Sequence, residues 1–167
     1  IMATPVNLRF AIPDEDVLMT PSSTQQYQLG EVLRTVDETN KQEKIYIYLQ
    51  ASGSLAANSI AYWAVNNKAS GLPAAGGEVN ILPLGTDYEV ADTEYAWFVA
   101  RGTYTGTADG SGLTTGTDVE WIKSTTTLKE VSGVRSATTI GFAQETIAAG
   151  QTGKIYLYGC GGASVAA

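Results

Sequence analysis

The residue types best suited to chemistry are carboxylates gathered in one short stretch. Four acids occur there: Asp87, Glu89, Asp92 and Glu94. Tyr95 and Trp97 follow them, and paired carboxylates beside aromatic rings are the arrangement of a glycosidase cleft. Acids at such spacing are also typical of solvated turns, and this second interpretation is favoured. The stretch therefore predicts no catalytic residue.

The chain contains no histidine, and its single cysteine is Cys160. Without histidine the usual general base, proton shuttle and commonest metal ligand are missing. A lone cysteine can form neither an intrachain disulfide nor a cysteine zinc cluster. No neighbouring histidine activates the Cys160 thiol, so we expect an inert thiol in a protein that is not an enzyme.

Glycine and threonine dominate residues 102–117. The run 106–112 lacks the lysine and the strand-to-helix setting of phosphate and dinucleotide loops. Asp109 and Asp118 carry oxygen ligands that suit calcium, but their spacing does not fit the EF-hand template. We expect no metal, no cofactor, and an exposed loop or loosely ordered hairpin over 102–117.

Three tryptophans, Trp63, Trp97 and Trp121, are candidates for an aromatic platform that binds sugar rings. Each stands in an apolar, strand-like context. Buried or subunit-interface tryptophans are therefore favoured, and a carbohydrate-binding module remains the third functional hypothesis.

Composition and charge limit the classes of partner. A chain of 167 residues, 44% hydrophobic and 16% charged, has the composition of one globular domain. The net charge of −7, with basic residues scattered singly, opposes nucleic-acid binding. No apolar run approaches the roughly 20 residues that cross a bilayer. Residues 1–10 form only a short apolar stretch that Pro5 breaks, so we expect no secretory signal. We also expect no membrane partner.

The elements that position these side chains are expected to be strands. Eighteen glycines and abundant Thr, Val, Ile and Tyr favour strands joined by tight turns. Besides the strand at 44–50 described below, strands are predicted at 29–36, 59–65, 79–84, 94–101, 119–122, 126–134 and 137–142. A hairpin is expected to join 59–65 to 79–84 across a long loop at 66–77.

The strongest strand signal lies at 44–50. Alternation places Ile45, Ile47 and Leu49 on a core face, and it leaves the tyrosines at 46 and 48 on a partly exposed face. The pentapeptide 44–48, Lys-Ile-Tyr-Ile-Tyr, recurs at 154–158 as Lys-Ile-Tyr-Leu-Tyr. Independent strands that obey one pattern explain this recurrence as well as a duplication does.

The fold class predicted from these strands is all-β, a compact antiparallel β-barrel or β-sandwich with an extended N-terminal arm. Residues 1–28 are expected to form the N-terminal strand and arm, and 29–167 a single β-rich domain. Apolar residues alternate in the arm: Val6, Leu8, Phe10 and Ile12. Such a segment can add a strand to a neighbour's sheet edge. An edge strand within its own domain is an equal alternative.

Two stretches of the sequence resemble a known family. In 44–57 a tyrosine-alternating strand runs into a Gly-x-Leu-Ala-Ala turn. In 140–159 a Gly-x-Ala-Gln strand is followed by an Ala-Ala-Gly turn, a glycine and another alternating strand. Together they resemble the decoration, or head cement, proteins of bacteriophage capsids. Lys154 departs from the family, whose last strand often carries a tryptophan there.

This resemblance implies a structural virion protein, made in the host bacterial cytoplasm and bound to the outer capsid surface. It implies a homotrimer that binds the expanded capsid and clamps adjacent subunits of the major capsid protein. The arm residues Val6, Leu8, Phe10 and Ile12 are then the expected capsid or subunit interface. A phage tail or fibre component is the alternative.

Overall fold

The computed structural model describes residues 18–37, 41–71, 82–121, 125–134 and 139–159. In these residues ten strands form one sheet in the order β1-β2-β4-β3-β5-β6-β10-β9-β7-β8, with β2 also paired to β6. The strands are β1 (Val32–Asp37), β2 (Gln42–Ala51), β3 (Ser59–Ala64), β4 (Lys68–Ser70), β5 (Pro83–Thr86), β6 (Tyr95–Thr107), β7 (Asp118–Trp121), β8 (Leu128–Glu130), β9 (Thr139–Ala143) and β10 (Thr152–Leu157). The all-β prediction is confirmed.

Five strands close a small barrel. β2, β4, β3, β5 and the first half of β6 follow one another, and antiparallel pairing of β2 with β6 closes the ring. The predicted pairing of 59–65 with 79–84 is seen as the antiparallel contact of β3 with β5. Strand β1 joins the barrel as an antiparallel neighbour of β2.

One contact in the barrel is parallel, although the sequence predicts an antiparallel structure with a loop at 66–77. β4 pairs in parallel with the end of β2, at Gln50↔Lys68 and Ala51↔Ala69. The physical reason is a tight reversal at Asn66 and Asn67, whose φ angles are 62° and 55°. Asparagine tolerates this left-handed conformation, so the chain returns beside β3 and reaches β2.

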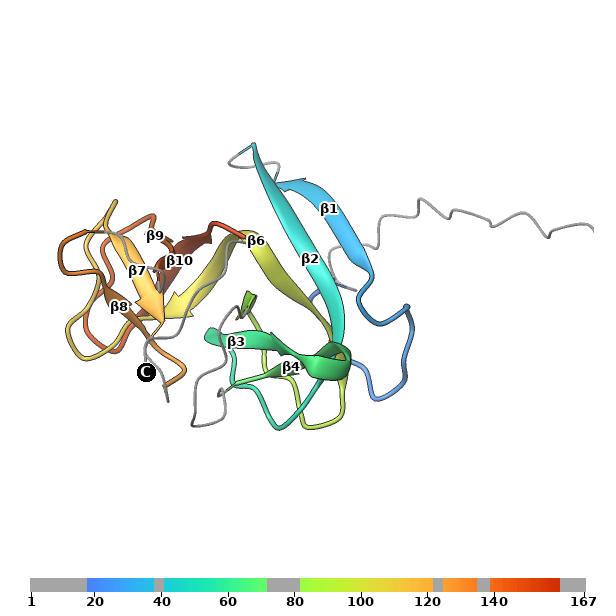
Figure 1. Cartoon of the computed structure of the whole chain (residues 1–167). Coiled ribbons are helices and arrows are strands. Elements are labelled where there is room, and N and C mark those ends of the chain that lie inside the picture. The colour runs from blue at the N-terminus through green and yellow to red at the C-terminus, as the bar shows by residue number, and fades with distance from the viewer. Residues whose placement is uncertain (1–17, 38–40, 72–81, 122–124, 135–138, 160–167) are drawn as a thin grey trace, which may run out of the picture.

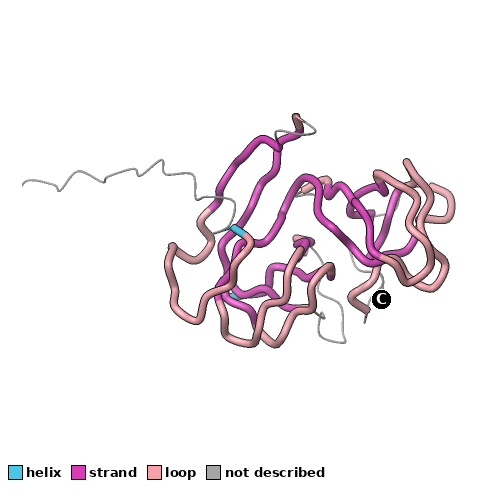
Figure 2. Tube along the Cα trace, turned by 180° about the vertical axis from the view of Figure 1, so that it is seen from behind, coloured by secondary structure: helices cyan, strands magenta, loops and turns pink. Residues whose placement is uncertain are grey.

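The second half of β6 leaves the barrel and enters a second group of strands. There it pairs with β10, which continues through β9 and β7 to the edge strand β8. Figure 1 shows β6 running between the two groups, with β1 to β4 on one side and β7 to β10 on the other. Seen from behind, the loops of the second group gather at the end away from the barrel (Figure 2).

The prediction of an exposed loop over 102–117 is wrong for its first part. Residues 102–107 belong to β6, and Gly102, Tyr104 and Gly106 are buried. Tyr104 fills the core, and the glycines beside it allow the neighbouring strand to approach closely. A Cβ atom added to Gly106 would lie 2.7 Å from Ile155 Cδ1. Small residues here therefore serve close packing, and the connecting loop covers only 108–117.

The prediction of one core face on β2 is incomplete. Ile47 and Leu49 pack with the buried Phe98, as predicted. Ile45, predicted to share this core face, is only half-buried and lies outside the core. Tyr46 and Tyr48, expected to be partly exposed, are only 6% and 3% exposed and belong to a second core. Side chains from the N-terminal residues and the second sheet cover this outer face, so both faces of β2 are buried.

The predicted reversal at 148–150 is confirmed. Gly150 has a φ of 69°, and the Gln151 amide donates a hydrogen bond of 3.0 Å to the Ala148 carbonyl. This turn brings β10 back beside β9, with Tyr156 opposite Phe142.

Candidate assembly surface

Two of the four acids considered for catalysis hold turns in place. Asp92 accepts a hydrogen bond of 2.7 Å from the Gly53 amide, and Glu94 accepts one of 3.0 Å from the Ala91 amide. Glu89 is exposed. Carboxylates that accept main-chain hydrogen bonds at turns stabilise local structure.

Asp87 has a different role, because it joins the barrel to the second half of β6. Its carboxylate lies 3.6 Å from Lys44 Nζ and accepts a hydrogen bond of 2.6 Å from the Thr105 amide. The two side chains are only 17% and 11% exposed. Lys44 Nζ also lies 5.2 Å from the ring centre of Tyr46. This largely buried ion pair is a structural link between β2, the end of β5, and β6.

The tryptophans do not line up on the surface. Trp97 is 4% exposed and Trp121 is 5% exposed, while Trp63 is half-buried. Trp121 Nε1 donates a hydrogen bond of 2.7 Å to the Thr125 carbonyl. The prediction that these rings lie in apolar surroundings is confirmed for Trp97 and Trp121, and neither offers a face to a sugar ring.

The oxygen ligands considered for calcium are engaged elsewhere. Asp109 Oδ1 accepts a hydrogen bond of 2.8 Å from the Ser111 amide, and Tyr158 donates one of 2.6 Å to Asp118 Oδ1. Within the described ranges, no group of three or more His, Cys, Asp and Glu side chains gathers as a metal site would require. The same residues include no helix that is long and apolar enough to cross a bilayer.

Residues 18–31 lie along the outer face of the β2–β6 pair. Ser22 and Tyr95 exchange two main-chain hydrogen bonds of 2.9 Å. The Gln26 amide donates one of 3.0 Å to the Tyr48 hydroxyl, and the Leu18 carbonyl accepts one of 2.9 Å from Tyr88. These bonds fix the first described residues, from Leu18 onward, against the sheet.

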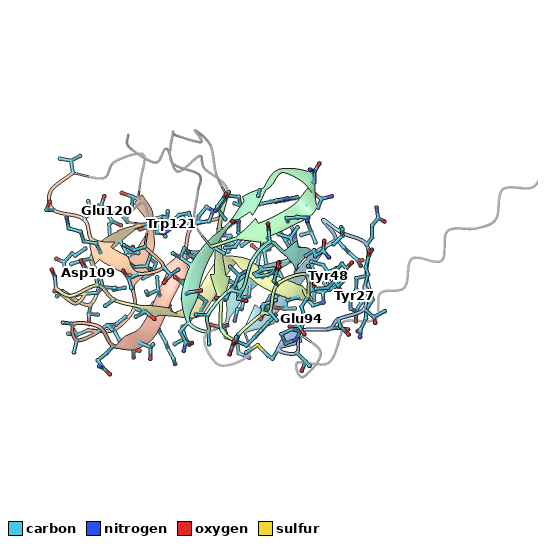
Figure 3. The ribbon with its side chains drawn as sticks, turned by 90° about the horizontal axis from the view of Figure 1, so that it is seen from below. Tyr27, Tyr48, Glu94, Asp109, Glu120 and Trp121 are labelled. Atoms are coloured by element: carbon cyan, nitrogen blue, oxygen red, sulfur yellow. The ribbon has the colours of Figure 1, made fainter. Side chains whose placement is uncertain are left out.

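Aromatic rings hold this segment against the sheet. Tyr27 makes edge contacts with Tyr48 and Trp97, with ring centres 5.1 Å apart in both pairs, and Tyr95 stacks on Tyr48 at 6.3 Å. Burial raises the pKa of Tyr48 above its usual value. Figure 3 shows Tyr27, Tyr48 and Glu94 at one end of the molecule, and Asp109, Glu120 and Trp121 at the other.

Strand β1, which follows this segment in the chain, carries two exposed apolar side chains. Val32 is 53% exposed and Val36 is 57% exposed. Between them lies Arg34, 71% exposed, whose guanidinium is 3.6 Å from the Glu43 carboxylate. β1 is the end of the sheet, paired among the described residues only with β2, and the β1–β2 hairpin projects from the barrel (Figure 1). An exposed apolar edge strand is a template for pairing with another chain.

No known protein-family model matches this sequence. No curated protein matches it either. Among solved structures, the fold is similar to the crystal structure of the head fibre gp8.5 N base of bacteriophage phi29, at 12% sequence identity and a TM-score of 0.49. The similarity covers 74% of this chain and 98% of that one.

The predicted interface residues Val6, Leu8, Phe10 and Ile12 lie outside the described residues, as does Cys160. Sequence reasoning missed the exposed valines of β1, although it placed a strand at 29–36. The signal was present: Val32 and Val36 alternate with a charged residue, as on a face that is not fully buried.

Proposed function

We propose that this chain is a structural protein of a bacteriophage virion, located on the outer surface of the capsid. It acts as a homotrimer that binds the expanded shell and clamps adjacent subunits of the major capsid protein. It binds neither nucleic acid nor membrane, uses no cofactor and catalyses no reaction.

The exposed edge of β1 is the observation that carries this proposal. The barrel and the second sheet bury their apolar side chains in two cores, whereas Val32 and Val36 stay exposed on the projecting hairpin. Monomeric proteins usually protect such edges with charges, prolines or covering segments. The resemblance of 44–57 and 140–159 to decoration proteins supports the phage capsid as the assembly that this edge helps to build.

The proposed work is mechanical. A ligand that binds only the expanded lattice stabilises that state by mass action. Three copies joined in one trimer engage several shell subunits at once, and this multivalency converts modest contacts into tight attachment. With a net charge of −7, the surface facing the shell would suit a basic patch on the capsid.

The N-terminal arm supplies the joining element in this proposal. Its apolar residues Val6, Leu8, Phe10 and Ile12 alternate, so they form one face of an added strand. Main-chain hydrogen bonds then provide affinity, and the alternate side chains provide specificity.

The test is the mass of the purified protein in solution, followed by co-sedimentation with undecorated expanded capsids and with immature capsids. A trimer that sediments only with expanded shells supports the proposal. A monomer that sediments with neither shell contradicts it. Long tubes or rings would identify a tail or fibre component instead.

A matched pair of arm variants tests the role of the arm in the same assay. Leu8→Asp places a charge on the apolar face, and we expect it to abolish co-sedimentation. Asn7→Asp adds the same charge on the opposite face, and we expect binding close to that of the unmodified protein. Equal binding by both variants would contradict the role of the arm.

A further inference from the structure

We propose that the outer edge of β1 receives the N-terminal segment 6–12 of a second copy of this chain, which adds to it as a strand. This inference rests on the proposed trimer, and it names the contact that would hold the trimer together.

The main-chain groups of β1 point in the required direction. The Tyr48 amide donates a hydrogen bond of 3.0 Å to the Glu31 carbonyl, just before β1, and the register continues as Val32↔Ile47. Bonded and non-bonded pairs alternate along an antiparallel ladder. The N–H and C=O groups of Val32, Arg34 and Val36 therefore point away from β2, toward the outer edge.

The same three residues carry the exposed side chains. Val32 and Val36 leave more than half of their surface uncovered. The guanidinium of Arg34 lies 3.6 Å from the Glu43 carboxylate, which Arg101 also approaches at 3.7 Å. An added strand with apolar alternation would cover the two valines while its main chain bonds to the edge. One binding partner can therefore satisfy both the free edge and the apolar face. It is an extended segment in which every second side chain is apolar.

Segment 6–12 has these properties. Its residues at 6, 8, 10 and 12 are apolar, and Pro5 and Pro13 bracket it. Proline lacks an N–H and limits a strand at its ends. The seven residues between the prolines match the length of β1, which has six.

The donor is inferred to be a neighbouring copy because of the linker and the symmetry. Asp14, Glu15 and Asp16 follow Pro13, and adjacent like charges extend a linker, which suits an arm that reaches a neighbouring copy. A contact between the arm of one copy and the edge of the next is head-to-tail, so three copies can close it into a ring. Pairing of two β1 edges with each other would give a two-fold dimer and leave the arm unused.

Engineered disulfides provide the experiment, in a Cys160→Ser background. One variant carries Leu8→Cys with Val36→Cys, and a second carries Leu8→Cys with Val32→Cys. The control combines Leu8→Cys with Lys129→Cys, because Lys129 is exposed on the other edge strand, β8. Each single variant is oxidised alone to reveal disulfides between identical positions. A disulfide requires Cα atoms about 4.4–6.8 Å apart.

We expect at least one β1 variant, but not the Lys129 control, to give covalent dimers and trimers on non-reducing gels. An intrachain disulfide would overturn the inference, because it would show the arm on its own edge. So would the absence of any disulfide in both β1 variants. If the unmodified protein is still a trimer that sediments with expanded capsids, the proposed function stands and only this contact fails.

Discussion

Two strands with nearly the same sequence have different surroundings in this fold. β2 contains Lys-Ile-Tyr-Ile-Tyr at 44–48, and β10 with its following residue contains Lys-Ile-Tyr-Leu-Tyr at 154–158. Both are antiparallel partners of β6, β2 along its first half and β10 along its second. In both, the aliphatic side chain at the fourth position, Ile47 or Leu157, is buried.

The two strands differ in how much of their tyrosine-bearing face is buried. Tyr48 is 3% exposed beneath Tyr27, whereas Tyr156 is half-buried and stacks on Phe142 with ring centres 5.4 Å apart. Lys44 is paired with Asp87 and largely buried, whereas Lys154 is exposed. The same pattern thus forms a two-sided core strand where other segments cover it, and a one-sided strand where they do not.

Truncation of one tyrosine from the covered face of β2 and one from the less covered face of β10 should give the largest difference. Tyr48→Ala removes a buried ring and the acceptor of the Gln26 amide, so we expect a loss of about 3–5 kcal/mol in unfolding free energy. Tyr156→Ala removes a half-exposed ring, with an expected loss of about 1 kcal/mol. Urea unfolding of both variants measures the difference. Equal losses would contradict the assignment of a covered and an uncovered face.

Glycine substitutions beside β10 should have the next largest effect. Gly106→Ala places a Cβ against Ile155 and Tyr104, so we expect a loss of about 1–3 kcal/mol from overpacking. A Cβ on Gly110 meets nothing within 4 Å, and Gly110→Ala should change stability by no more than about 0.5 kcal/mol. Thermal unfolding compares the two. Similar melting temperatures would mean that 102–107 is not packed as a strand.

Substitution of the lysines at the matching positions, 44 and 154, tests the same difference in burial between β2 and β10. Lys44→Met leaves the largely buried Asp87 carboxylate without its cation, and we expect a loss of about 1–2 kcal/mol. Lys154→Met changes an exposed side chain, with an expected effect within about 0.5 kcal/mol. Denaturant midpoints at low and high salt test this pair. A larger loss for Lys154 would reverse the comparison.

The smallest effect concerns alkaline pH. Burial raises the pKa of Tyr48 in the folded state, so the unfolded chain loses this proton first, near pH 10. Stability linked to Tyr48 is therefore complete below pH 10 and is lost as pH rises toward the folded-state pKa. Tyr48→Phe should make the fall in stability above pH 10 shallower, by up to about 1.4 kcal/mol per pH unit. An unchanged slope would contradict the burial of this hydroxyl.

Strand positions were largely predictable because alternation is a local property. The predicted segments 44–50, 59–65 and 94–101 correspond to β2, β3 and β6. The continuation of β6 through 102–107 was missed because glycine and threonine are typical of loops, and only the contact with Ile155 explains the glycines. The parallel strand β4 was missed because three residues carry too little pattern to predict a strand.

The candidate surface was only partly accessible from the sequence. The apolar alternation of the arm at Val6 to Ile12 could be read directly, and it remains a prediction because those residues lie outside the described ranges. The exposure of Val32 and Val36 could be inferred from the charged residue between them. Their position at the edge of the sheet could not, because strand order depends on contacts between residues far apart in the chain.

The sequence by itself determined that the protein is all-β, where most strands lie, and which side chains alternate along them, since these follow from residue type and a period of two. Only the tertiary structure decided that both faces of β2 are buried, that Lys44 pairs with Asp87, and that β1 is left at an edge. The physical reason is that alternation fixes two faces of a strand, whereas burial depends on which distant segments cover each face.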